Sequence, residues 1–131
     1  MNPMIKKIAG LFIFLFSYAF SFSQLIPVTR GMIIKKTTGI KKAGYSIDAC
    51  DSLNKAVIVI EGNNIVVDFN NAILNGNPSH QLPDKFYGVA IIIRNGKNIT
   101  IKNLTARGYR IALMAKNVTG LTIENCDFSY N

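Results

Sequence analysis

The sequence has no tryptophan, one histidine and two cysteines among its 131 residues. With His80 as the only histidine, metal sites built on a histidine pair are excluded, and Cys50, His80 and Cys126 lack the short spacings of zinc ligands. We therefore expect no metal site, and no motif identifies a cofactor. The absence of tryptophan also favours a protein without catalytic activity on sugars, because sugar platforms often use its broad face.

Long apolar runs are also scarce, and the one near the N-terminus is shorter than the ~20 residues of a membrane span. Ile8 to Phe22 covers 15 residues, follows Lys6 and Lys7, and ends in Ser21-Phe22-Ser23, which offers small residues for cleavage. We predict that residues 1–23 are a cleavable signal peptide, with an uncleaved anchor as the alternative. No cysteine follows the run, so a lipid anchor has no support there. The mature chain is expected to be secreted or periplasmic, without a stable membrane anchor.

Acidic residues are few, at 7 against 15 lysines and arginines. Removal of residues 1–23 takes two lysines away, so the mature chain keeps 13 basic residues and a net charge of +6. Such a balance suits an acidic polysaccharide, a nucleic acid or an anionic membrane, and the alternative is a surface that only keeps the protein soluble. No aromatic residues alternate with the lysines, so we expect no nucleic-acid platform.

The sequence does contain an internal repeat, which indicates a repeat architecture. Residues 91–104 are followed by a similar segment at 113–126, so the period is 22 residues. An earlier copy begins at Val57-Ile58-Val59, which matches Ile91-Ile92-Ile93 at an offset of 34. The difference between the two offsets, 12 residues, falls in an insertion loop at 75–87, whose Asn-Gly-Asn-Pro and Pro-Asp sequences are typical of loops.

Each unit of the repeat holds two runs rich in β-branched residues, which alternate between an inward and an outward face. One unit cannot bury its apolar face alone, but units stacked about 4.8 Å apart form a continuous apolar core between parallel strands. This pattern predicts an all-β fold, a parallel β-solenoid of about three turns over residues 57–131, with residues 24–56 as its N-terminal cap. The predicted inward residues are Val57, Val59, Ile65, Val67, Ile91, Ile93, Ile99, Ile101, Leu113, Ala115, Leu121 and Ile123.

Two further columns of the stack follow from the same alignment. Positions 64, 98 and 120 hold Asn, Asn and Gly, the residue types that tolerate the left-handed backbone of a sharp corner. On the outward phase, side chains of alternating charge are expected to be direct neighbours, namely Asp68, Lys102 and Glu124.

Two predictions concern side chains that depart from the simple pattern. Cys126 falls in the inward column of Leu104, which favours a buried free thiol over a disulfide with Cys50. An apolar column lies on the outward phase and is expected either to be covered by the cap or by later residues, or to be a contact surface. Its members are Ile58, Ile92 and Met114.

The segments Asn98-Ile99-Thr100-Ile101-Lys102-Asn103 and Leu121-Thr122-Ile123-Glu124-Asn125-Cys126 resemble the repeats of right-handed parallel β-helix proteins, the superfamily that includes pectate lyases. The resemblance covers residues 57–131 and implies a right-handed parallel β-helix. The superfamily contains polysaccharide lyases, glycoside hydrolases, periplasmic proteins that mature copper sites, and adhesin stalks. No catalytic residue is carried over, because no family-specific catalytic motif is present.

Five residues are candidates for binding a substrate, and the catalytic residues stay unknown. Loops on a rigid scaffold often carry binding residues, which selects His80, Asp84 and Lys85 in the insertion loop. Arg94 and Lys116 share one outward column and offer cations to a carboxylate. The alternative is that all five are solvated surface groups.

Two functions are consistent with this sequence. The first is an exported carbohydrate-active protein, a lyase or hydrolase of an acidic polysaccharide. The alternative is a non-catalytic module for binding, adhesion or periplasmic maturation. The repeat continues through Phe128-Ser129-Tyr130 without a capping segment, so we expect this chain to be the N-terminal portion of a longer protein whose further turns would stack on it.

Overall fold

The computed structural model describes residues 24–76 and 82–131. The predicted signal peptide, residues 1–23, and His80 lie outside the described residues. The described chain is built from strands and one short 3-10 helix, η1. In chain order the elements are β1 (Leu25–Ile26), β2 (Met32–Ile34), β3 (Thr38–Ile40), β4 (Gly44–Ser46), β5 (Ala56–Asn75), η1 (Pro83–Lys85), β6 (Val89–Arg107) and β7 (Ile111–Asp127).

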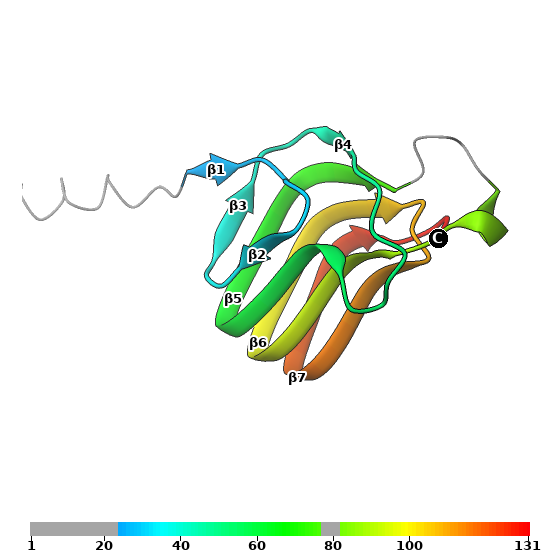
Figure 1. Ribbon diagram of the computed structural model, residues 1–131. Helices are drawn as coiled ribbons and strands as arrows, with labels where there is room; N and C mark the ends of the chain where they lie inside the picture. Colours follow the sequence, from blue (N-terminus) through cyan, green and yellow to red (C-terminus); the bar gives the residue numbers. More distant parts are fainter. Residues whose placement is uncertain (1–23, 77–81) are drawn as a thin grey trace, which may run out of the picture.

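The three long strands β5, β6 and β7 lie side by side in this order, and both pairings are parallel (Figure 1). On the other side of β5, the short strands β2, β3 and β4 each pair in parallel with a different part of it, and β1 pairs with β3. The all-β, parallel architecture predicted from the repeat is therefore confirmed, and it is consistent with a β-solenoid.

The long strands bend without losing their pairing because asparagine and glycine occupy the bends. Asn64, Asn98 and Gly120 have φ values of 56°, 55° and 74°, which confirms the predicted corner column. A second bend holds Asn95 and Asn117, with φ values of 52° and 55°. A left-handed backbone costs almost no free energy at a glycine. At an asparagine it costs more than at glycine but less than at most other residues.

The register between the long strands confirms two of the predicted columns. Lys102 is the partner of Asp68 on β5 and of Glu124 on β7, so the column of alternating charge exists. Ile101 lies between Val67 and Ile123 in the same way.

The alignment of the first run of β5 is wrong by one residue. Ile58 and Ile60, not Val57 and Val59, are the partners of Ile91 and Ile93, so the offset here is 33 rather than 34. Asn95 is an extra residue in β6, placed between the pairs Glu61–Arg94 and Gly62–Gly96. The physical reason is a β-bulge, which inserts one residue into one strand of a pair. Because every residue of both runs is Val or Ile, the slip leaves the apolar pattern unchanged.

The core is formed mainly by the inward side chains of β5 and β6, and Val28, Ile34 and Ile40 of the N-terminal segment complete it. Ile60, Ile93, Val67 and Ile101 have no exposed surface, whereas Ile123, above Ile101 on β7, is 46% exposed. The other inward side chains of the last strand and of the residues after it pack against the core but are only partly buried. These are Leu113, Val118, Leu121, Cys126 and Phe128, whereas Ala115, which was also predicted to be inward, is exposed.

The structure modifies the prediction for the cysteines. Cys50 and Cys126 are both free thiols, as favoured by the sequence, but Cys126 is half-buried rather than fully buried because β7 has a neighbour on one side only. Its burial nevertheless raises the pKa of the Cys126 thiol above its ordinary value. Cys50 is exposed on the connection between β4 and β5.

The outward apolar column exists with different members. Pairing places Val59, not Ile58, beside Ile92 and Met114, and it adds Ile33 of β2. Val59 and Ile92 are only 8% and 1% exposed, although their side chains are not part of the core between the strands. Ile33, in contrast, is 53% exposed. The middle of this column is thus covered and its β2 end is open to solvent.

The connection between β4 and β5 is the loop that joins these two strands in Figure 1, and two contacts fix it to the body of the sheet. The hydroxyl of the fully buried Tyr109 donates a hydrogen bond of 2.7 Å to the carbonyl oxygen of Ile47. Gly88, with φ of 77°, packs so closely that a Cβ there would lie 2.4 Å from Cβ of Ala49 and 2.8 Å from the carbonyl oxygen of Cys50. Residues 47–50 therefore have a defined position, which matters because the same connection lines the candidate site.

Candidate functional site

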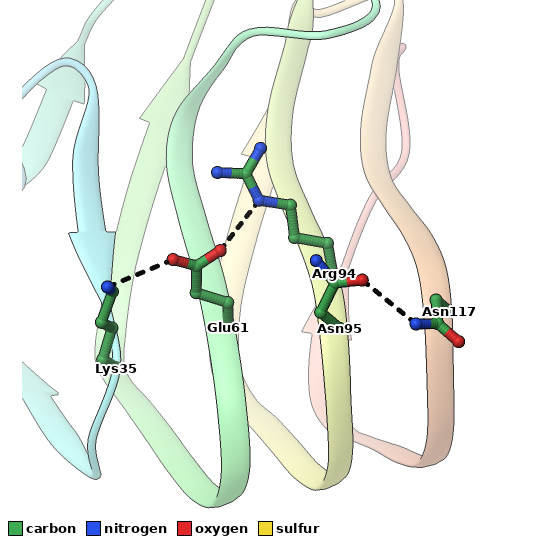
Figure 2. A network of polar contacts seen from close by, with 5 residues as sticks. All are labelled: Lys35, Glu61, Arg94, Asn95 and Asn117. Carbon is green, nitrogen blue, oxygen red and sulfur yellow. Dashed lines mark hydrogen bonds and ion pairs between the residues drawn. The ribbon is translucent and has the colours of Figure 1, made fainter.

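A row of charged side chains crosses the sheet from β2 to β7. Glu61 on β5, Arg94 on β6 and Lys116 on β7 are partners in the register, and Lys35 directly follows β2. Nε of Arg94 lies 2.9 Å from Oε2 of Glu61, and Nζ of Lys35 lies 3.5 Å from Oε1 of the same carboxylate (Figure 2). One carboxylate is thus held between two cations, and the exposed Lys116 adds a third cation beside Arg94.

The ion pair fixes both the charge of Glu61 and the orientation of Arg94. The hydrogen bond from Arg94 lowers the pKa of the Glu61 carboxyl below its ordinary value, and the charges of Arg94 and Lys35 add to this effect. Glu61 accepts its hydrogen bond from Nε of Arg94, so the outer edge of the guanidinium, formed by its two terminal nitrogens, faces away from Glu61 (Figure 2). An arginine held in this way presents its planar donor fork to another group.

Arg94 forms one wall of a hollow of about 240 Å³, called here the arginine hollow. Its lining includes two further cations, Arg30 and Lys55, and no carboxylate. Arg30 also forms an ion pair with Asp48. The lining residues used below are Arg30, Ile33, Cys50, Lys55, Val59 and Arg94.

A second hollow of about 230 Å³, called here the asparagine hollow, lies at the bend where the bulge at Asn95 adds one residue to β6 relative to β5. Nδ2 of Asn117 donates to Oδ1 of Asn95 at 3.1 Å, and Oδ1 of Asn63 accepts from the backbone N–H of Lys97 at 3.1 Å. Its lining is polar, with one cation and no carboxylate, and such amide groups suit the hydroxyl groups of a sugar. The lining residues are Asn63, Asn95, Gly96, Lys97, Asn117 and Thr119.

The two hollows are lined by consecutive residues of β6, since Arg94 lines the arginine hollow and Asn95 lines the asparagine hollow. Together their linings contain four cations, Arg30, Lys55, Arg94 and Lys97, and no carboxylate. We call the surface formed by the two hollows and the charged row the cationic face. Its charge favours anionic ligands, and its asparagines offer donors and acceptors for uncharged parts of such a ligand.

The structure brings together two of the residues that the sequence selected. Arg94 and Lys116 are direct partners on β6 and β7, and Arg94 lines the arginine hollow. Asp84 and Lys85 are exposed in η1 and line neither hollow. The fifth candidate, His80, lies outside the described residues.

Sequence reasoning missed Arg30 and Lys55, which come from segments outside the repeat. The repeat alignment contains no position for them, so no signal in the sequence placed them near Arg94. The asparagine hollow could be predicted in part from the sequence, because Asn95 and Asn117 are 22 residues apart and occupy the same place in their units.

Within residues 24–76 and 82–131, no group of three or more His, Cys, Asp and Glu side chains is arranged to hold a metal ion. Across the same residues, no helix is long and apolar enough to cross a membrane. No family model, curated protein or solved structure matches this chain.

Proposed function

We propose that this chain is an exported right-handed parallel β-helix of the pectate-lyase-like type, in which residues 57–131 form about three turns and residues 24–56 cap them. Support comes from the parallel register of β5, β6 and β7, from left-handed asparagines at the bends, and from an apolar core on one phase of each strand. The charged start and short apolar run at residues 1–23 support export into the periplasm or the medium.

On this scaffold we propose that the cationic face binds an acidic polysaccharide. The observation that carries this proposal is that the linings of the two hollows, which include the consecutive residues Arg94 and Asn95, hold four cations and no carboxylate. Cations on adjacent strands, such as Arg94 and Lys116, recur at the strand spacing of about 4.8 Å, which suits a ligand with repeated negative charges. The alternative is that this is a charged surface without a ligand.

A lyase activity is a second candidate, favoured by the presence of Lys55 and Arg94 in one hollow. Elimination from a uronate needs a base and a group that neutralises the carboxylate, and these two side chains supply both chemical types. A hydrolase has less support, since it needs two carboxylates on either side of the bond to be cleaved and neither lining contains one. Adhesion or periplasmic maturation without catalysis remains compatible with binding alone.

Binding is tested by isothermal titration calorimetry of the mature protein with polygalacturonate and with its fully methyl-esterified, uncharged form. We expect binding only to the charged polymer, with an affinity that falls as salt is added because exposed charges are screened. Equal binding to both polymers, or to neither, would contradict the proposal. The lyase is tested in the same mixtures by ultraviolet absorbance of an unsaturated product, and its absence leaves a binding protein.

A further inference from the structure

The arginine hollow differs from the asparagine hollow in that apolar side chains, called here its floor, line it together with cations. Ile33 and Val59 are neighbours in the outward apolar column and both line this hollow. Ile33 is 53% exposed, so this part of the floor is open to solvent. Arg94 and Lys55 stand beside the floor, and Arg94 directs its two terminal nitrogens away from Glu61. The hollow therefore combines a donor fork, a second cation and an apolar surface.

We infer that the arginine hollow is a subsite for one carboxylate-bearing sugar unit, a hexuronate. The Arg94 fork receives the carboxylate, Lys55 adds a second charge-assisted contact, and the apolar C–H face of the ring lies on Ile33 and Val59. This inference rests on the proposed binding of an acidic polysaccharide and names the unit that the face recognises. A volume of about 240 Å³ is below the ~300 Å³ at which drug-sized ligand pockets begin, so one sugar unit fits it better than several.

The preference for a carboxylate follows from geometry. A guanidinium with a free edge binds the two oxygens of a planar carboxylate with two parallel hydrogen bonds. Glu61 does not compete for this edge, because it contacts Nε of Arg94 and is not among the lining residues. We therefore assign Glu61 as a positioning residue, which holds the Arg94 guanidinium in the orientation that the ligand meets.

The hollow contains its own reporter, because the exposed thiol of Cys50 belongs to its lining. Cys126, half-buried on β7 and outside both linings, is an internal control. The reduced mature protein is treated with iodoacetamide, an uncharged reagent, with and without saturating trigalacturonate, and each thiol is followed by mass spectrometry. We expect the ligand to slow alkylation of Cys50 by about tenfold or more, since a covered thiol is inaccessible to the reagent, and to leave Cys126 unchanged. The trimethyl ester of the same trimer should give no protection.

Variants assign the protection to the named side chains. Arg94→Gln and Lys55→Gln should each raise the trimer concentration needed for half-protection by about tenfold or more, the usual scale for a lost charge-assisted contact. Glu61→Gln should raise it less, and Lys85→Gln, an exposed cation in η1 that lines neither hollow, should leave it unchanged. Lys55 is exposed, so its variant tests the subsite even if Arg94→Gln fails to fold.

The outcomes separate this inference from the proposed function. If polygalacturonate binds but Cys50 is alkylated at an unchanged rate, the subsite is overturned and the function stands. If the trimer protects Cys50 but the polymer does not bind, the subsite stands and the proposed function is overturned. If neither ligand binds, both fail. Protection that persists unchanged in Arg94→Gln and Lys55→Gln also overturns the subsite.

Discussion

Nδ2 of Asn98 on β6 donates a hydrogen bond of 2.8 Å to Oδ1 of Asn64 on β5, and both residues have φ near 55°. This single hydrogen bond joins neighbouring strands, and both asparagines adopt the left-handed backbone of the bend. Nδ2 of Asn125 binds Oδ1 of Asn103 at 2.8 Å in the same way. Each asparagine at a bend therefore supports the turn in its own strand and the contact to the adjacent strand.

The first prediction separates these two roles of Asn98. Asn98→Ala removes the side-chain hydrogen bond and also puts an alanine, which disfavours positive φ, in the left-handed region. We therefore expect the free energy of unfolding to fall by about 1–3 kcal/mol. Asn98→Gly keeps the backbone conformation available and loses only the side-chain contact, so it should cost less. Urea denaturation of both variants measures the difference. Equal losses would show that the backbone conformation contributes nothing.

The second prediction concerns Gly96, where close approach rather than backbone conformation excludes a side chain. A Cβ at this position would lie 2.3 Å from the carbonyl oxygen of Gly62 and 2.6 Å from Cδ1 of Ile99. We expect Gly96→Ala to lower the free energy of unfolding by more than ~2 kcal/mol, because the backbone oxygen can move only if the bulge rearranges.

Gly44→Ala is the matched control for Gly96→Ala. A Cβ at Gly44 meets no atom within 4 Å, so the substitution should change stability by about 0.5 kcal/mol or less. A thermal unfolding scan of both variants gives the comparison. If Gly96→Ala is as stable as Gly44→Ala, the bend at β5 and β6 is looser than the structure indicates.

The fold was predictable where two units have equal length. From β6 to β7 the offset is 22 throughout, so the partners of Lys102 and Ile101 followed from the sequence. From β5 to β6 the bulge at Asn95 changes the offset from 33 to 34, and a run composed only of Val and Ile gives no sign of the slip. A single-residue bulge is decided by backbone hydrogen bonding across the strands, which the apolar pattern does not contain.

The candidate site was predictable only within the repeat. Arg94 and Lys116 share a column, and this placed them together. Arg30 and Lys55 line the same hollow as Arg94. Arg30 pairs with Asp48, which lies in the segment 47–50 that contacts with Tyr109 and Gly88 fix, and these are contacts between segments distant in sequence. Such contacts depend on how side chains of unrelated segments pack, so neither spacing nor composition reveals them.

The third prediction compares two residues of one inward column that differ in burial. Ile101 has no exposed surface, and Ile101→Ala should cost about 2–5 kcal/mol through lost burial and the cavity left behind. Ile123, its partner on β7, is 46% exposed, so Ile123→Ala should cost clearly less. Chemical denaturation of the two variants provides the ratio. A larger loss for Ile123 would mean that a further element covers β7 in solution.

The last prediction concerns acid stability and depends on Asp68. Burial alone would raise the pKa of this carboxyl, but hydrogen bonds from the Asn103 amide and the Asn70 backbone N–H, together with the charge of Lys102, lower it below its ordinary value of 3.8. A carboxyl whose pKa is lower in the folded state stabilises that state above its unfolded pKa and loses this effect as the pH falls through the folded pKa. The contribution of Asp68 should therefore be present above the ordinary pKa of 3.8 and be lost as the pH falls from there through the lower pKa of the folded state. Asp68→Asn has no charge to titrate, so the difference in melting temperature between wild type and variant should shrink as the pH is lowered through this range. A difference that stays constant across it would show that the charge on Asp68 does not stabilise the fold, and that its role is limited to accepting the hydrogen bonds that an asparagine oxygen also accepts.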